Sequence, residues 1–179
     1  MAAALVATLV ACADTPNVYN ARIYHDRWPD LLYAGGDEPL SAVIWGNPFR
    51  DDRAGLEKAV LAAVQKAHNN ASAHFTATPP ALEPRSPYVA LLFNANEVQS
   101  GLPCADLSGL TPQDGVNGDV HVQAAICRNG APLTGASGHV GNVSDADDPR
   151  FRQLMHSVAV SLFQAPPGYG LVVTSPPAP

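Results

Sequence analysis

The sequence predicts an α+β fold: a two-layer sandwich in which an antiparallel-rich sheet carries two helices, about 52–68 and 149–163, on one face. Three observations lead to this class. One segment repeats apolar residues at helical spacing, another alternates apolar and polar residues, and a strong hairpin signal follows that alternation. The predicted order is strand, helix, two strands, a hairpin and a helix, with no internal repeat.

The first strand of the predicted domain covers 40–46, a stretch rich in β-branched and aromatic residues between turn residues. The helix over 52–68 begins near Asp51 and Asp52, whose carboxylates can cap amide groups at the positive end of the helix dipole. Its apolar residues recur at i, i+3, i+4 and i+7, which predicts an amphipathic helix. They are Leu56, Ala59, Val60, Ala63, Val64 and Ala67.

The rest of the predicted sheet comes from residues 72–78, 88–93 and a hairpin. The run 88–93 is continuously apolar, which is typical of a central strand covered on both faces. Residues 119–127 alternate, and Asn129-Gly130 favours a type I′ turn into a second arm at 131–140. The apolar side of the alternation is formed by Val120, Val122, Ala124 and Ile126.

The second helix begins after Asp147-Asp148, with Pro149 at its first position. It ends near Phe163, before a Pro-Pro-Gly sequence. A last strand is predicted at 171–174, followed by a flexible tail at 175–179. The apolar residues with helical spacing are Phe151, Leu154, Met155, Val158 and Leu162.

Composition excludes several classes of protein. The 179 residues fit one domain, and the formal net charge is −6 with no block rich in lysine or arginine. We therefore expect no nucleic-acid partner, because binding to phosphates needs clustered positive charge. Only 15% of the residues are charged and 17 are proline, which favours an exported protein.

The amino terminus carries a processing signal. Residues 2–10 are uncharged and apolar, but a membrane span needs about 20 residues. The sequence Leu9-Val10-Ala11-Cys12 resembles a bacterial lipobox. That resemblance implies cleavage before Cys12, which would then carry lipid on its sulfur and its new amino group. The basic residue that usually begins such a signal is absent, so either the true start lies upstream of Met1 or the signal is weak. A buried amino-terminal helix is the alternative.

The lipobox resemblance covers only the first dozen residues, and it implies a domain organisation. Residues 1–11 are the signal peptide, 12–38 the lipidated cysteine and a tether, and 39–174 a single α+β domain. Within the tether, 21–24 has the composition of a short edge strand. Ala13 rather than Asp follows the cysteine, which by the same resemblance favours the outer membrane over the inner membrane.

The cysteine count agrees with export. The chain has three cysteines, Cys12, Cys104 and Cys127. Lipidation accounts for the first, and the other two would form a disulfide in an oxidising periplasm. Two buried free thiols are one alternative. A metal-binding cysteine pair is the other, although the pair lacks the short spacing of a zinc site.

The candidate catalytic residues lie on the predicted hairpin. Asp119, His121 and Gln123 share one face of a strand, and an Asp–His couple can act as a general base. Ser137 lies in a near match to the serine-hydrolase sequence G-x-S-x-G, in which His139 replaces the last glycine. A solvated sheet face and a flexible glycine-bearing strand are the simpler interpretations.

The histidines do not predict a metal site. None forms an H-E-x-x-H or H-x-H pattern. With a strict two-residue turn, His121 lies opposite Gly138, and His139 points to the other face of the sheet. Only a bulge of one residue would bring the two histidines together. We therefore expect no metal and no cofactor.

The sequence favours a non-enzymatic, lipid-anchored periplasmic domain that binds a partner or supports an envelope assembly. Its expected partners are the membrane, through the lipid on Cys12, and an envelope protein. The main alternative is a periplasmic hydrolase that uses Asp119, His121 and Gln123, with Ser137. A secreted or adhesive accessory subunit is a third.

Overall fold

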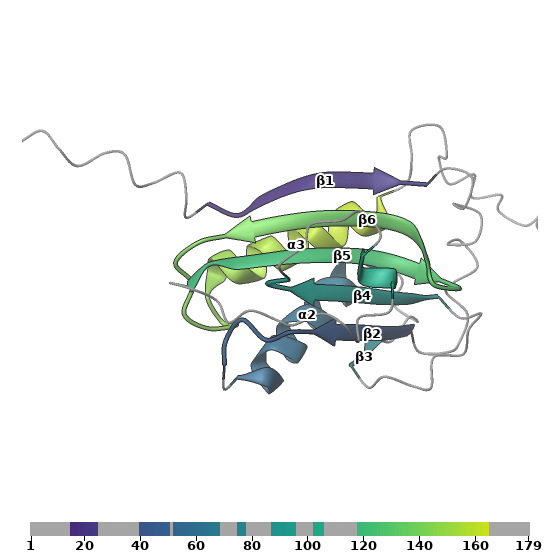
Figure 1. The fold of residues 1–179 in the computed structure, drawn as a ribbon. Helices are drawn as coiled ribbons and strands as arrows, with labels where there is room; N and C mark the ends of the chain where they lie inside the picture. Colours follow the sequence, from purple (N-terminus) through teal and green to yellow (C-terminus); the bar gives the residue numbers. More distant parts are fainter. Residues whose placement is uncertain are drawn as a thin grey trace, which may run out of the picture.

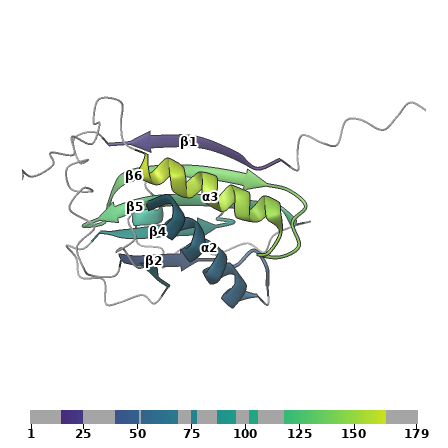
Figure 2. The ribbon, with the colours of Figure 1, turned by 180° about the vertical axis from the view of Figure 1, so that it is seen from behind.

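The computed structural model describes residues 15–24, 40–50, 52–68, 75–77, 87–95, 102–105 and 118–164. In this part of the chain, one mixed sheet of six strands carries two helices on the same face, which confirms the predicted α+β class (Figures 1 and 2). The opposite face carries a short 3₁₀ helix, so the description as a two-layer sandwich remains a prediction. The elements are β1 (Asn17–Ile23), β2 (Leu40–Trp45), α2 (Arg53–His68), β3 (Phe75–Thr76), β4 (Tyr88–Phe93), η2 (Leu102–Cys104), β5 (Val120–Arg128), β6 (Ala131–Val140) and α3 (Pro149–Phe163).

The strand order is β1-β6-β5-β4-β2-β3. The pairs β1–β6, β6–β5 and β5–β4 are antiparallel, whereas β2 runs parallel to both β4 and β3. A parallel return needs a crossover, and α2 is the helix between β2 and β3. In the strand order, β4 lies between β5 and β2 and is therefore inside the sheet, as its continuously apolar sequence predicts.

Strand β1 corrects the predicted tether. Residues Asn17–Ile23 pair antiparallel with β6 at one edge of the sheet, with Asn17 opposite His139. The domain thus begins within the segment 12–38, and the edge strand is longer than the predicted 21–24. The sequence NVYNARI has no regular alternation, and the pairing with β6 is a long-range contact that local periodicity does not report.

The core lies between the helices and the sheet. Helix α2 buries Leu56, Val60, Ala63 and Val64, at positions that the sequence predicts. Each large apolar side chain buried in this way contributes about 1.5–3 kcal/mol. Helix α3 buries Phe151, Leu154, Met155, Val158, Ala159 and Leu162. Its helical spacing therefore predicts the buried side correctly.

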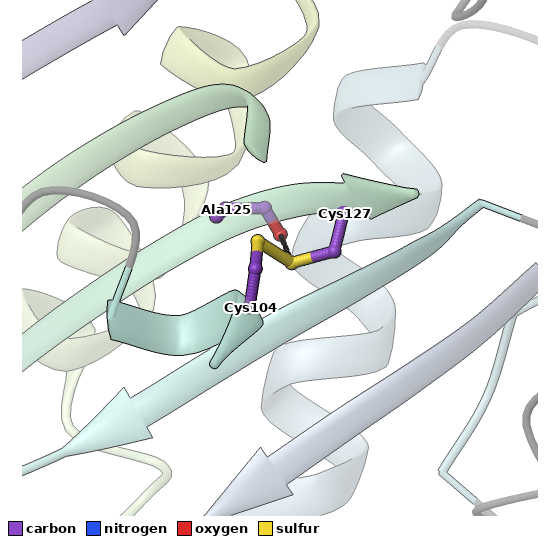
Figure 3. Close-up of a disulfide and its surroundings, with 3 residues drawn as sticks. All are labelled: Cys104, Ala125 and Cys127. Carbon is purple, nitrogen blue, oxygen red and sulfur yellow. Dashed lines mark hydrogen bonds between the residues drawn. A yellow bond between two sulfur atoms is a disulfide. The ribbon is translucent and has the colours of Figure 1, made fainter. Parts of the chain in front are cut away.

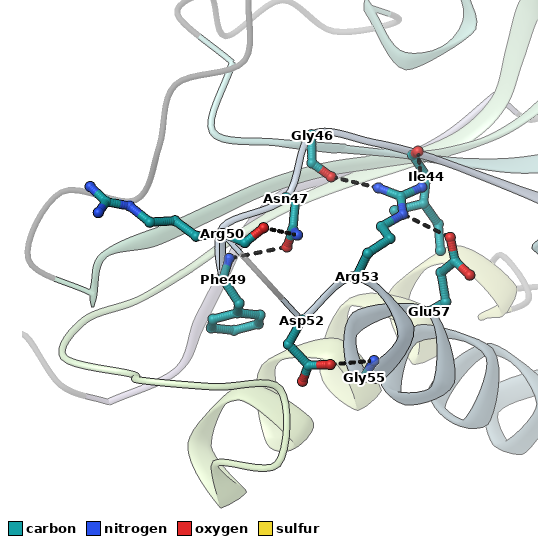
Figure 4. Close-up of polar contacts among 9 residues, drawn as sticks. All are labelled: Ile44, Gly46, Asn47, Phe49, Arg50, Asp52, Arg53, Gly55 and Glu57. Carbon is teal, nitrogen blue, oxygen red and sulfur yellow. Dashed lines mark hydrogen bonds and ion pairs between the residues drawn. The ribbon is translucent and has the colours of Figure 1, made fainter.

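Both helices start with the predicted caps. The Asp52 carboxylate accepts a hydrogen bond from the Gly55 amide at 2.8 Å, and the Asp148 carboxylate accepts one from the Arg150 amide at 2.8 Å. The Arg53 guanidinium then ties the start of α2 to the end of β2 (Figure 4). It donates to Ile44 O at 2.7 Å and to Gly46 O at 2.8 Å.

The hairpin register differs from the strict register expected from the sequence. Asn129 and Gly130 have φ of 53° and 72°, as a type I′ turn requires. Next to the turn, Cys127 pairs with Pro132, but Ile126 pairs with Thr134. One extra residue, Leu133, thus forms a bulge. Pro132 has no N–H to donate to the ladder of hydrogen bonds, and a β-bulge commonly forms beside such a residue.

Several predictions lie outside the described residues. These include residues 1–14 with Cys12, the strand at 171–174 and the tail at 175–179, and two of the six histidines, His25 and His74, also lie there. Of the strand predicted over 72–78, the structure describes Phe75–Thr76 as β3. Among the helices in the described ranges, none has both the length and the apolar character needed to cross a membrane.

Candidate functional site

The outer face of the sheet, which we define as the face away from α2 and α3, carries the candidate residues. Val120, Val122 and Ala124 pack in the core on the helix side, so the residues between them point to the outer face. This confirms the predicted alternation of β5. On the outer face a second apolar cluster is formed by Ala90, Cys104, Ala125 and Cys127, with Tyr88 packed against it.

A disulfide joins Cys104 of η2 to Cys127 of β5, with the two Cα atoms 5.5 Å apart (Figure 3). Both cysteines are buried. Cys127 Sγ lies 4.0 Å from Ala125 O, a packing contact because a disulfide sulfur has no proton to donate. The structure therefore contains the predicted pairing in place of two free thiols or a metal-binding pair, and the bond holds η2 on the outer face.

The bulge at Leu133 places His121 of β5 directly opposite His139 of β6. The centroids of the two imidazole rings are 4.3 Å apart, and the rings are inclined by 31°. Asp119 Oδ1 lies 4.0 Å from His139 Nε2. The prediction that His139 lies on the other face is therefore wrong, since a register shift of one residue reverses the direction of a side chain.

Asn94 fixes the backbone of His121. The backbone N–H of His121 donates to the side-chain Oδ1 of Asn94 at 2.8 Å, and the backbone N–H of Asn94 donates to His121 O at 2.9 Å. Asn94 has a positive φ of 48°, a conformation that asparagine adopts more readily than most residues. Both backbone groups of His121 are thus bonded to a single residue at the end of β4.

Partial desolvation by the surrounding sheet lowers the pKa of His121 below the usual value of 6.5, and the neighbouring His139 lowers it further. The negative charge of Asp119 opposes this shift. Desolvation is the largest cause, so the net shift of the pKa favours the neutral ring of His121. A neutral imidazole can accept a proton or bind a metal ion.

The predicted catalytic residues share the outer face but do not form a nucleophile–base couple. Ser137 lies opposite Gln123, and both are largely buried. The two histidines form the next pair along the hairpin on the same face. Among the described residues, no hydrogen bond joins Ser137 Oγ to His121 or His139. The hydrolase prediction therefore lacks the contact that would support it.

The other described histidines belong to the packing of the helices. His68 lies against Phe163 and Phe75, at ring-centroid distances of 4.9 Å and 5.6 Å. His156 lies on α3, and its Nδ1 is buried. Within the described ranges, no group of three or more His, Cys, Asp or Glu residues could hold a metal ion. Only the pair His121 and His139 brings two imidazoles together there.

No family model matches the chain, and no curated protein matches it. Among solved structures, it is similar to a PelC dodecamer from Paraburkholderia phytofirmans, with 17% sequence identity and a TM-score of 0.42. The similarity covers 83% of this chain and 96% of that chain. At this distance the similarity does not assign a function.

Proposed function

We propose that this chain is a lipid-anchored, non-enzymatic domain of the bacterial cell envelope that is held to a membrane by acyl chains on Cys12 and binds an envelope protein. The observation that carries the proposal is the lipobox-like sequence Leu9-Val10-Ala11-Cys12 in a chain of three cysteines. With Cys104 and Cys127 joined to each other, Cys12 is the remaining thiol. A buried disulfide is typical of proteins that fold outside the reducing cytosol.

The position of β1 supports a short connection between lipid and domain. Thr15 is the first described residue, and only three peptide units separate it from Cys12. At about 3.6 Å per residue, their Cα atoms lie at most about 11 Å apart. A lipid on Cys12 would therefore hold the start of β1 close to the bilayer.

This short connection also orients the domain. The start of β1 lies at the same end of the sheet as the ends of β2, β4 and β6 (Figure 1). That end would face the membrane, whereas the hairpin turn at Asn129-Gly130 would project away from it. An envelope partner would then approach the helices, the edge strand or the hairpin end.

Stable anchoring needs more than one acyl chain, because each buried methylene contributes ~0.8 kcal/mol and a single chain binds reversibly. The lipobox resemblance supplies this requirement, since the modified cysteine carries lipid at two atoms. The described part of the chain has no helix that could replace this anchor.

The test is metabolic labelling of the full-length gene product in a bacterial host with an alkyne analogue of palmitate. We expect label on the wild-type protein and on a Cys104→Ser/Cys127→Ser variant, whose Cys12 is intact. We expect no label on Cys12→Ser, which should leave the membrane fraction. Absence of label on the wild type, or label that persists on Cys12→Ser, would contradict the proposal.

A further inference from the structure

We propose that His121 and His139 bind a divalent transition-metal ion on the outer face of the sheet, with the two imidazoles as protein ligands and the remaining positions open to water or to a ligand from a partner. The relationship that carries this proposal is their position directly opposite each other on neighbouring strands, with ring centroids 4.3 Å apart. The proposal does not depend on lipidation.

The two rings lie close enough for one nitrogen of each to reach the same ion once the rings turn. Metal–nitrogen bonds to histidine are about 2.0–2.1 Å long, so two ligating nitrogens lie at most about 4.2 Å apart. Directly opposite residues on antiparallel strands have Cβ atoms about 4.5–5.5 Å apart, so their side chains can reach the same ion. The side chain of His139 is 28% exposed and His121 is exposed. Among the described residues, no side-chain hydrogen bond restrains either ring, so both can turn their nitrogens toward one ion.

The surroundings favour a cation. Asp119 Oδ1 lies 4.0 Å from His139 Nε2, and its negative charge lowers the free energy of a positive ion placed at the pair. The backbone bonds from Asn94 hold β5 in register at His121. Both ligands therefore come from paired strands and not from loops, which reduces the ordering that binding requires.

The ligand set indicates which ions bind best. Imidazole suits Cu²⁺, Ni²⁺ and Zn²⁺, and for a given set of nitrogen ligands the affinity is greatest for Cu²⁺. Because the described residues supply only two protein ligands, the site is open, unlike a structural zinc site with four. Open positions allow an ion to be exchanged or shared with a second molecule.

The test is a calorimetric titration of Cu²⁺ and Zn²⁺ into the full chain that carries Cys12→Ser, a change that removes the free thiol as a competing ligand. We expect saturable binding of one ion, tighter for Cu²⁺ than for Zn²⁺. Separate His121→Asn and His139→Asn variants should each weaken Cu²⁺ binding by roughly 100-fold, because losing a ligand should cost at least as much as the ~10–100-fold that losing one of its outer-shell partners costs. His156→Asn, on α3, is the matched control and should bind like the parent.

Electron paramagnetic resonance of the Cu²⁺ complex provides a second measurement. The parent should show coupling to two imidazole nitrogens, and each single variant should lose one of them. Circular dichroism spectra must show that the variants remain folded. If a variant does not fold, the glutamine substitution at the same position, His121→Gln or His139→Gln, replaces it. Unchanged Cu²⁺ affinity in both histidine variants, or no saturable binding in the parent, would overturn the proposal.

Discussion

Gly138 of β6 lies directly against Leu154 of α3. A Cβ atom placed on Gly138 would come within 2.7 Å of Leu154 Cδ1 and within 2.8 Å of Val158 Cγ2. It would also lie 3.3 Å from Asn17 O in the neighbouring edge strand. The absence of a side chain at this position therefore lets α3 pack closely on the sheet.

Gly138→Ala should lower the free energy of unfolding by about 1–3 kcal/mol, because an added methyl group overpacks the contact with α3. Gly135→Ala is the matched control in the same strand, since its Cβ would meet only Ala124 O, at 3.6 Å. Urea unfolding monitored by circular dichroism measures both. Equal stability of the two variants would show that α3 adjusts without cost.

The disulfide should contribute roughly 3 kcal/mol to stability by closing a loop between residues 23 apart in sequence. The variant Cys104→Ala/Cys127→Ala should lose about this amount in urea unfolding, whereas Cys12→Ser should not. Because both bonded cysteines are buried, a thiol reductant should act slowly on the folded protein. Complete reduction under native conditions within seconds would contradict the burial.

Arg53→Met should weaken the attachment of α2 to β2 because it removes the donors to Ile44 O and Gly46 O. The Arg53 side chain is 43% exposed, so solvent screening limits the expected loss to about 1 kcal/mol. Lys58→Met, at an exposed position on the same helix, is the control. Indistinguishable urea midpoints for the two variants would mean that the Arg53 bonds add no net stability.

Stability should fall as the pH drops below the ordinary pKa of histidine, about 6.5. Burial lowers the pKa of His68 in the folded protein, so the unfolded chain binds a proton at a higher pH than the folded protein does. The stabilisation from a neutral His68 is complete above that range and decreases as the pH falls through it.

The measurement is the difference in melting temperature between about pH 7.5 and about pH 5. His68→Leu should reduce this difference, since it removes the titrating ring and a buried Nδ1 without a partner among the described residues. Val160→Thr, at an exposed position on α3, should leave the difference unchanged. An identical difference in wild type and His68→Leu would contradict the assignment to His68.

The sequence by itself determined the local elements of this fold. Helices α2 and α3 agree with the predicted ranges to within a residue, and β2, β4 and both hairpin arms occur where composition, apolar runs and alternation place them. It also put Asp119, His121 and Gln123 on one face, because alternation is a local property of an extended strand.

Only the tertiary structure decided the pairing. The edge position of β1, the parallel run of β2 beside β4, and the contact between His121 and His139 all depend on residues far apart in the chain. The single extra residue at Leu133 reverses the face of His139. The glycines of this strand predict that a bulge can form, and Pro132 is a further local signal beside the position where it does form. Short-range periodicity reports which residues form a strand, but hydrogen bonding between strands sets their order and register.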